Sequence, residues 1–132
     1  MTKLLKMEHD EDPAQLILKN AGDLSGYEIF GNQVLVGVYE RPAKTKSGLY
    51  LAETTRQEDQ YQGKAGLVLA LGPSAFVSDA NYDFKGQSVK KGDWVAIFVT
   101  DGRKIMLGNG QLCRIVEDQF IRMRIPAPDA VY

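Results

Sequence analysis

Only a few side chains in this sequence could take part in catalysis, and each stands alone. There is one histidine, His9, in a polar N-terminal stretch, and one cysteine, Cys113, in an apolar run. We expect His9 to be solvated and Cys113 to be a buried structural thiol, because reactive thiols need a charged and accessible setting. Neither residue has the neighbours of a zinc site or of a thiol–histidine pair. The sequence therefore predicts no catalytic residue, no metal site and no cofactor.

The other polar clusters have simpler explanations than chemistry. The carboxylates at residues 8–12 and 117–118 fit solvated faces or turns, and the glycines at 108 and 110 are too closely spaced for a phosphate loop. Sixteen basic and 17 acidic residues give a formal net charge of -1 without a basic stripe, so we expect no nucleic-acid partner. No apolar run is long enough for a signal peptide or a membrane span, which predicts a cytoplasmic protein. Together these patterns favour a binding protein over an enzyme.

The stretch that most suggests binding is a long polar connection at residues 40–63, called the long loop below. The runs on either side of it, residues 34–39 and 66–71, have the apolar and β-branched composition of strands. Connections usually have about 4–6 residues, and much longer ones are functional or disordered. In the middle of the long loop, Gly48 introduces a small apolar island that consists of Leu49, Tyr50 and Leu51. We predict that this island is an interaction peptide.

The rest of the chain predicts the scaffold that holds the long loop. Asp12 and Pro13 form a helix start and Gly22 a helix stop, so we expect a short helix within an N-terminal arm at residues 1–28. This helix should pack on its own domain, with docking on a neighbouring subunit or on a partner as the alternative. Strand patterns separated by turn signals then follow at residues 34–39, 64–71, 89–98, 104–107, 111–116 and 120–125.

These patterns predict an all-β fold, a small and partly open β-barrel that spans residues 29–125. A second irregular loop, residues 73–88, interrupts the strands, and prolines 126 and 128 predict an extended C-terminal tail at residues 126–132. A chain of 132 residues is enough for one such domain with short appendages.

Four motifs, in their order and spacing, resemble the GroES-like co-chaperonins, the small lid subunits of the bacterial chaperonin, and especially their bacteriophage-encoded relatives. The resemblance covers roughly residues 29–125. The motifs are the opening strand Gln33-Val34-Leu35-Val36, the Thr45-Lys46-Ser47-Gly48 lead into Leu49-Tyr50-Leu51, the return strand from Gly63-Lys64 to Val68-Leu69-Ala70-Leu71-Gly72-Pro73, and Val89-Lys90-Lys91-Gly92-Asp93-Trp94-Val95 with Ile97-Phe98.

The resemblance implies a homo-oligomeric ring, usually of seven subunits, that caps a chaperonin without catalysing a reaction. The long loop would be the mobile loop of the family, in which Gly48, Leu49, Tyr50 and Leu51 bind the chaperonin apical domains, and residues 73–88 would form the roof loop. A last strand at residues 120–125 would close the ring against the first strand of a neighbouring subunit. The interface residues implied in this way are Val34, Val36, Phe120, Ile121, Met123 and Ile125.

Two other interpretations stay open at the level of the sequence. The same barrel could be a bacteriophage structural protein that decorates or cements a capsid, with the N-terminal arm and the C-terminal tail as contact peptides on neighbouring shell subunits. Such a protein would be found in the virion, whereas a phage-encoded lid would act in the host cytoplasm. Alternatively, the long loop could serve only its own domain, with Leu49 and Leu51 folded back onto the core.

Overall fold

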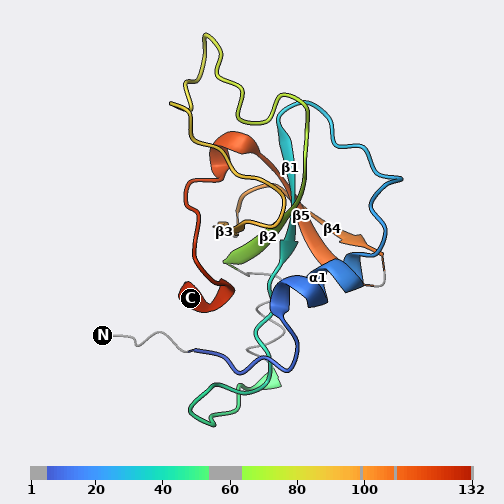
Figure 1. Ribbon diagram of the computed structural model, residues 1–132, viewed down its shortest axis with the longest axis vertical. Helices are drawn as coiled ribbons and strands as arrows, with labels where there is room; N and C mark the ends of the chain where they lie inside the picture. Colours follow the sequence, from blue (N-terminus) through green and yellow to red (C-terminus); the bar gives the residue numbers. More distant parts are fainter. Residues whose placement is uncertain (1–5, 54–63, 99, 109, 132) are drawn as a thin grey trace.

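A computed structural model describes residues 6–53, 64–98, 100–108 and 110–131 (Figure 1). Its main feature is one five-stranded antiparallel sheet with the strand order β3-β2-β1-β5-β4, which does not close. The predicted all-β, partly open barrel is therefore confirmed. The elements are α1 (Pro13–Ala21), β1 (Gln33–Val38), β2 (Ala65–Leu71), β3 (Trp94–Ala96), β4 (Arg103–Leu107), β5 (Gln111–Glu117) and the short 3-10 helices η1 (Asp118–Phe120) and η2 (Pro128–Ala130).

The central strand β1 organises the sheet. It pairs with β2 along one edge, with an irregularity between Leu35 and Val36, and with β5 along the other edge. Because its side chains point alternately to the two faces, β1 contributes to two apolar clusters. Leu35 lies in the cluster beneath α1, and Val34 and Val36 lie in the cluster on the opposite face. Burial on both faces explains why the strand runs in the sequence are almost continuously apolar.

The N-terminal helix forms where the sequence predicts it. The Asp12 carboxylate accepts a hydrogen bond from the Gln15 N–H at 3.3 Å, and the chain leaves the helix at Gly22, whose φ of 74° favours glycine. Ile17 is buried against the sheet, and a Cβ built on Gly37 of β1 would lie only 2.6 Å from its Cγ2 atom. The absence of a side chain at Gly37 thus lets the helix approach the sheet closely. The prediction that α1 packs on its own domain is confirmed.

The predicted strand at residues 120–125 is wrong. The chain turns through η1, and only residues 123–125 pair with β3. They form an isolated bridge between Arg124 and Val95, and the Ala96 N–H to Met123 carbonyl and Ile125 N–H to Trp94 carbonyl hydrogen bonds flank it. The carboxylate of Asp118 accepts a hydrogen bond from the Gln119 N–H at 2.7 Å, and this local bond favours a turn over an extended strand. Of the alternating apolar residues, Ile121 and Ile125 pack on the core, whereas Met123 between them is exposed.

Two smaller differences concern the ends of predicted elements. Of the pattern at residues 89–98 only Trp94–Ala96 forms a strand, because residues 90–93 make a turn that is closed by the Asp93 carboxylate and by Gly92 at a φ of 94°. The C-terminal tail is not extended throughout, since η2 shapes it at Pro128–Ala130. None of the helices described in the structure is both long and apolar enough to cross a membrane.

Candidate docking site

The first part of the long loop folds into a small hairpin at residues 43–51, called the docking hairpin below. Lys44 and Tyr50 form an isolated antiparallel bridge, and the Thr45 N–H donates to the Leu49 carbonyl at 2.8 Å. Gly48 takes a φ of 93° at the turn, which glycine adopts at low cost. In Figure 1 this hairpin projects from the bottom of the molecule, whereas residues 73–88 extend at the top. Residues 54–63, the last part of the long loop, lie outside the described parts of the chain.

Thr45 is the internal support of the docking hairpin. Its side chain is buried, its Oγ1 accepts a hydrogen bond from the Leu49 N–H at 3.0 Å, and the same oxygen lies 2.9 Å from the Ser47 hydroxyl. These bonds let a threonine side chain close a turn in place of backbone groups. This role of Thr45 was not predicted, although a threonine shortly before Ser-Gly is a recognisable turn signal.

The tip of the docking hairpin presents apolar side chains to solvent. Leu49 is 60% exposed and Tyr50 is 75% exposed, while Leu51 is half-buried. The Lys44 ammonium lies 5.8 Å from the centre of the Tyr50 ring and covers part of one ring face. The alternative in which Leu49 folds back onto the core is therefore wrong. The tip of the hairpin thus exposes an aliphatic and an aromatic side chain next to each other.

The N-terminal arm adds a third strand-like segment to the docking hairpin. Met7 forms an antiparallel bridge with Thr45, the Glu8 N–H donates to the Lys44 carbonyl at 3.0 Å, and the Lys46 N–H donates to the Lys6 carbonyl at 2.9 Å. The Met7 side chain is fully buried. No pattern in the sequence indicates this pairing.

Residues 118–131, called the C-terminal segment below, fix the N-terminal arm in turn. Asp129, in η2, is buried, and its Oδ2 accepts a hydrogen bond from the Met7 N–H at 2.9 Å. Its other carboxylate oxygen lies 3.9 Å from the Lys6 ammonium. Three parts of the chain that are far apart in sequence therefore meet at the base of the docking hairpin.

The six residues implied for a subunit interface lie in different environments. Val34, Val36 and Ile125 are buried in the core, Phe120 and Ile121 are half-buried, and Met123 is exposed. Both edges of β1 are already hydrogen-bonded within the chain. A neighbouring subunit therefore cannot add a strand to β1, and the buried side chains of Val34 and Val36 do not reach the surface.

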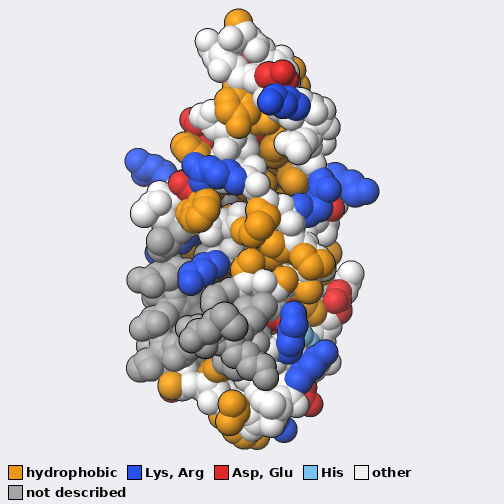
Figure 2. Space-filling model, turned by 90° about the vertical axis from the view of Figure 1, so that its left-hand side faces the viewer, with side chains coloured by type: hydrophobic (Ala, Val, Ile, Leu, Met, Phe, Trp, Pro, Cys, Tyr) orange, Lys and Arg blue, Asp and Glu red, His pale blue; other side chains and the backbone are white. Residues whose placement is uncertain are grey.

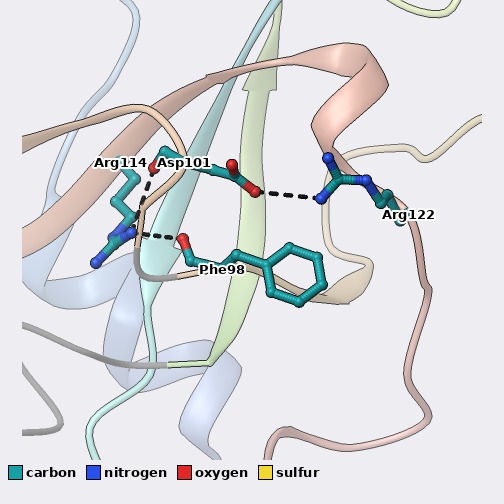
Figure 3. A network of polar contacts seen from close by, with 4 residues as sticks. All are labelled: Phe98, Asp101, Arg114 and Arg122. Carbon is teal, nitrogen blue, oxygen red and sulfur yellow. Dashed lines mark hydrogen bonds and ion pairs between the residues drawn. The ribbon is translucent and has the colours of Figure 1, made fainter.

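A polar network supports the exposed surface near Met123. Figure 3 shows Arg114, a buried residue of β5, whose Nη1 donates to the carbonyls of Phe98 at 2.8 Å and Asp101 at 3.2 Å. Burial lowers the pKa of the Arg114 guanidinium, and the charge of Asp101 opposes this effect. The Asp101 carboxylate also pairs with Arg122 at 3.4 Å, and the Arg122 guanidinium lies 5.0 Å from the centre of the exposed Phe98 ring.

This network fixes Phe98 and Arg122 side by side on the surface. Figure 2 views the side of the molecule that carries β3 and the C-terminal segment, and hydrophobic side chains gather across its middle. Exposed Phe98 follows β3 by two residues, and exposed Met123 lies in the C-terminal segment.

Residues 73–88, the predicted roof loop, form an aromatic cluster at the other end of the barrel. The ring centres of Phe76 and Phe84 are 5.3 Å apart, and those of Tyr82 and Phe84 are 4.6 Å apart. The backbone N–H of Phe76 donates to the buried carboxylate of Asp118 at 2.9 Å. Beneath the cluster lies a hollow of about 870 Å³ that the C-terminal segment lines on its other side.

The side chains of His9 and Cys113 are both packed within the protein, His9 partly and Cys113 fully. His9 differs from the expectation of a solvated side chain, because it is half-buried and its Nε2 lies 2.6 Å from the Tyr39 hydroxyl. Cys113 is buried as predicted, and burial raises the pKa of its thiol to about 12, so the thiol is protonated at neutral pH. Among the residues that the structure describes, no three His, Cys, Asp or Glu side chains lie close enough to hold a metal ion.

Comparison with known proteins adds one finding to this geometry. The family model described as the chaperonin 10 kDa subunit matches residues 27–122, which is most of the barrel. No curated protein sequence matches the chain. The arm that carries Met7 and the segment that carries Asp129 both lie outside the matched residues.

Proposed function

We propose that this chain, which belongs to the chaperonin 10 kDa subunit family, binds a chaperonin through its docking hairpin. Membership identifies it as a co-chaperonin, in a non-catalytic family whose members assemble into rings and interact with a chaperonin. The proposal concerns the contact itself, in which Gly48, Leu49, Tyr50 and Leu51 lie in a groove of a chaperonin apical domain.

The exposure of Leu49 and Tyr50 at the tip of the hairpin carries this proposal. Burial of a leucine or a similarly large side chain contributes roughly 1.5–3 kcal/mol, so two such side chains give a modest affinity for each subunit. The tyrosine can bury its ring while its hydroxyl stays in water or meets a polar group at the rim of the groove. In a ring, several such weak contacts act together through their high effective concentration.

Two exposed apolar segments on opposite sides of the barrel support assembly into a ring. The connection from α1 to β1, at the right of Figure 1, carries Tyr27 and Phe30, and Phe30 is 71% exposed. The C-terminal segment, at the left, carries Met123 beside half-buried Phe120 and Ile121. A head-to-tail ring needs two different patches of this kind on each subunit. We therefore propose that these segments meet between neighbouring subunits, without the side chains of Val34 and Val36.

Chaperonin binding by a double variant tests the docking proposal. Purified protein is mixed with a chaperonin and nucleotide, and the affinity is compared with that of Leu49→Asp combined with Tyr50→Asp. We expect a loss of at least roughly 100-fold, because each subunit contact loses about 3 kcal/mol of apolar burial. Val77→Asp in the roof loop is the matched control, since Val77 is 57% exposed, and it should bind like the wild type.

Equal affinity of the double variant and the wild type would show that the hairpin is not the docking element. No binding of the wild-type protein at high concentration would refute the lid function itself.

A bacteriophage origin and a capsid-decorating role form a second proposal, supported by the two terminal segments outside the family match. In that role the arm and the tail would contact shell subunits. In the structure, however, the Met7 N–H donates to the Asp129 carboxylate of the same chain. This internal role of both terminal segments favours the lid. Mass spectrometry of purified virions distinguishes the two, because a decorating protein must be present there at stoichiometric copy number.

A further inference from the structure

The docking hairpin does not stand alone, because the N-terminal arm lies against its first strand. Two backbone hydrogen bonds, Glu8 N–H to Lys44 O and Lys46 N–H to Lys6 O, flank the bridge between Met7 and Thr45. A two-stranded hairpin is marginally stable in water, and a third strand with buried side chains stabilises it. Buried Met7 supplies such a side chain.

Asp129 holds this third strand in place. A carboxylate that accepts a backbone N–H forms one of the stronger hydrogen bonds of proteins, and burial strengthens the bond further. The Met7 N–H bonds to Asp129 at 2.9 Å, and both residues are buried. Loss of the carboxylate would leave the Met7 N–H buried without this acceptor, and such a group is costly. The ion pairs of Lys6 with Asp129 and of Lys44 with Glu8 add little, because Lys6 and Glu8 are each more than half exposed.

We infer that the N-terminal arm and η2 form a clamp that holds the docking hairpin in its exposed conformation, with Asp129 as the positioning residue. This inference rests on the proposed docking function. A segment that is already ordered loses less conformational entropy when it binds, so the clamp increases affinity without touching the partner. The clamp is an addition of this chain to the barrel, because both of its parts lie outside residues 27–122.

Hydrogen exchange of the free protein tests the clamp without any chaperonin. In Asp129→Ala, we expect the amides of Glu8 and Lys46 to exchange roughly tenfold faster or more, the effect of losing one hydrogen bond to a charged group. The Tyr39 amide, which bonds to the Ala65 carbonyl within the barrel, should keep its rate and thereby show that the fold is intact. Unchanged rates at Glu8 and Lys46 would overturn the clamp.

A matched control and a conservative variant separate the role of Asp129 from a general effect. Asp79→Ala removes another carboxylate that accepts backbone N–H groups, those of Asn81 and Tyr82, but in the distant roof loop, and it should leave the hairpin amides unchanged. Asp129→Asn keeps an oxygen acceptor and should restore most of the protection. If the amides of Glu8 and Lys46 exchange as fast in Asp129→Asn as in Asp129→Ala, the hydrogen bond to Met7 is not the cause of their protection.

Chaperonin binding completes the test. We expect Asp129→Ala to bind about tenfold more weakly than the wild type and Asp129→Asn nearly as tightly, although neither variant changes Leu49 or Tyr50. Equal affinities of Asp129→Ala and the wild type, together with faster exchange, would refute the positioning role. Failure of the wild type to bind would refute the proposed function alone, because the exchange experiment decides the clamp by itself.

Discussion

Asp118 connects three parts of the barrel, and its replacement by alanine gives a quantitative test of the fold. The buried carboxylate accepts hydrogen bonds from the backbone N–H of Phe76 at 2.9 Å and of Gln119 at 2.7 Å, and from the side-chain amide of Asn32 at 3.3 Å. It thereby joins the start of η1 to the base of the roof loop and to the turn before β1. Phe76 has a φ of 61°, which costs a non-glycine residue energy and needs support from its surroundings.

The size of the effect follows from these contacts. A hydrogen bond to a charged group contributes about 1.5–3 kcal/mol, and a buried donor that loses its partner costs about 1–3 kcal/mol. The bond to Gln119 joins neighbouring residues and the contact with Asn32 is long, so the bond to Phe76, which joins parts of the chain 42 positions apart, dominates. We therefore expect Asp118→Ala to lower the free energy of unfolding by about 3 kcal/mol.

Urea denaturation measures this change directly. The midpoint should fall while the slope of the transition stays the same, because the surface exposed on unfolding does not change. Asp118→Asn, which retains one acceptor oxygen, should lose less than the alanine variant. A loss within about 0.5 kcal/mol, the usual size of a surface substitution, would refute the assignment of Asp118 as a structural acceptor.

Two further predictions concern assembly and pH. If the exposed segment before β1 contacts a neighbouring subunit, Phe30→Glu should shift the mass found by native mass spectrometry from oligomer to monomer; Val77→Glu is the control, and an unchanged oligomer would exclude Phe30 from the interface. Because the pKa of the Cys113 thiol rises from 9.0 to about 12 on folding, the unfolded chain ionises first, and the free energy of unfolding should fall as the pH rises from about 9 to 12. Cys113→Ala should remove this component of the pH dependence, and an equal slope in both proteins would contradict the burial of the thiol.

Local signals made the helix and most strands predictable. Asp12, Pro13 and Gly22 fix the ends of α1 through bonds between near neighbours, so the sequence alone was sufficient. The pattern at residues 120–125 misled because alternation reports which side chains face the core and not whether the backbone pairs as a strand. The side-chain bond of Asp118 that turns the chain there is not visible in the alternation.

The proposed docking site could be predicted only in part. The apolar island within a polar loop pointed to Leu49 and Tyr50, because composition is a property of the local sequence. The clamp could not be predicted, since the bond between Met7 and Asp129 joins residues separated by 122 positions. No pattern within either terminal segment specifies the other. Only the folded barrel brings them together.

Assembly into a ring makes the order of each hairpin more important than it would be in a single subunit. A lid that binds through several weak contacts depends on every subunit presenting its hairpin at the same time. If each hairpin had to become ordered on binding, the cost in conformational entropy would recur at each contact. These free-energy costs add, so the factors by which they weaken the affinity of the ring multiply. A clamp made of segments outside the barrel reduces this cost in every subunit and leaves the exposed Leu49 and Tyr50 unchanged. Affinity can therefore change through Asp129 while the partner meets the same docking surface.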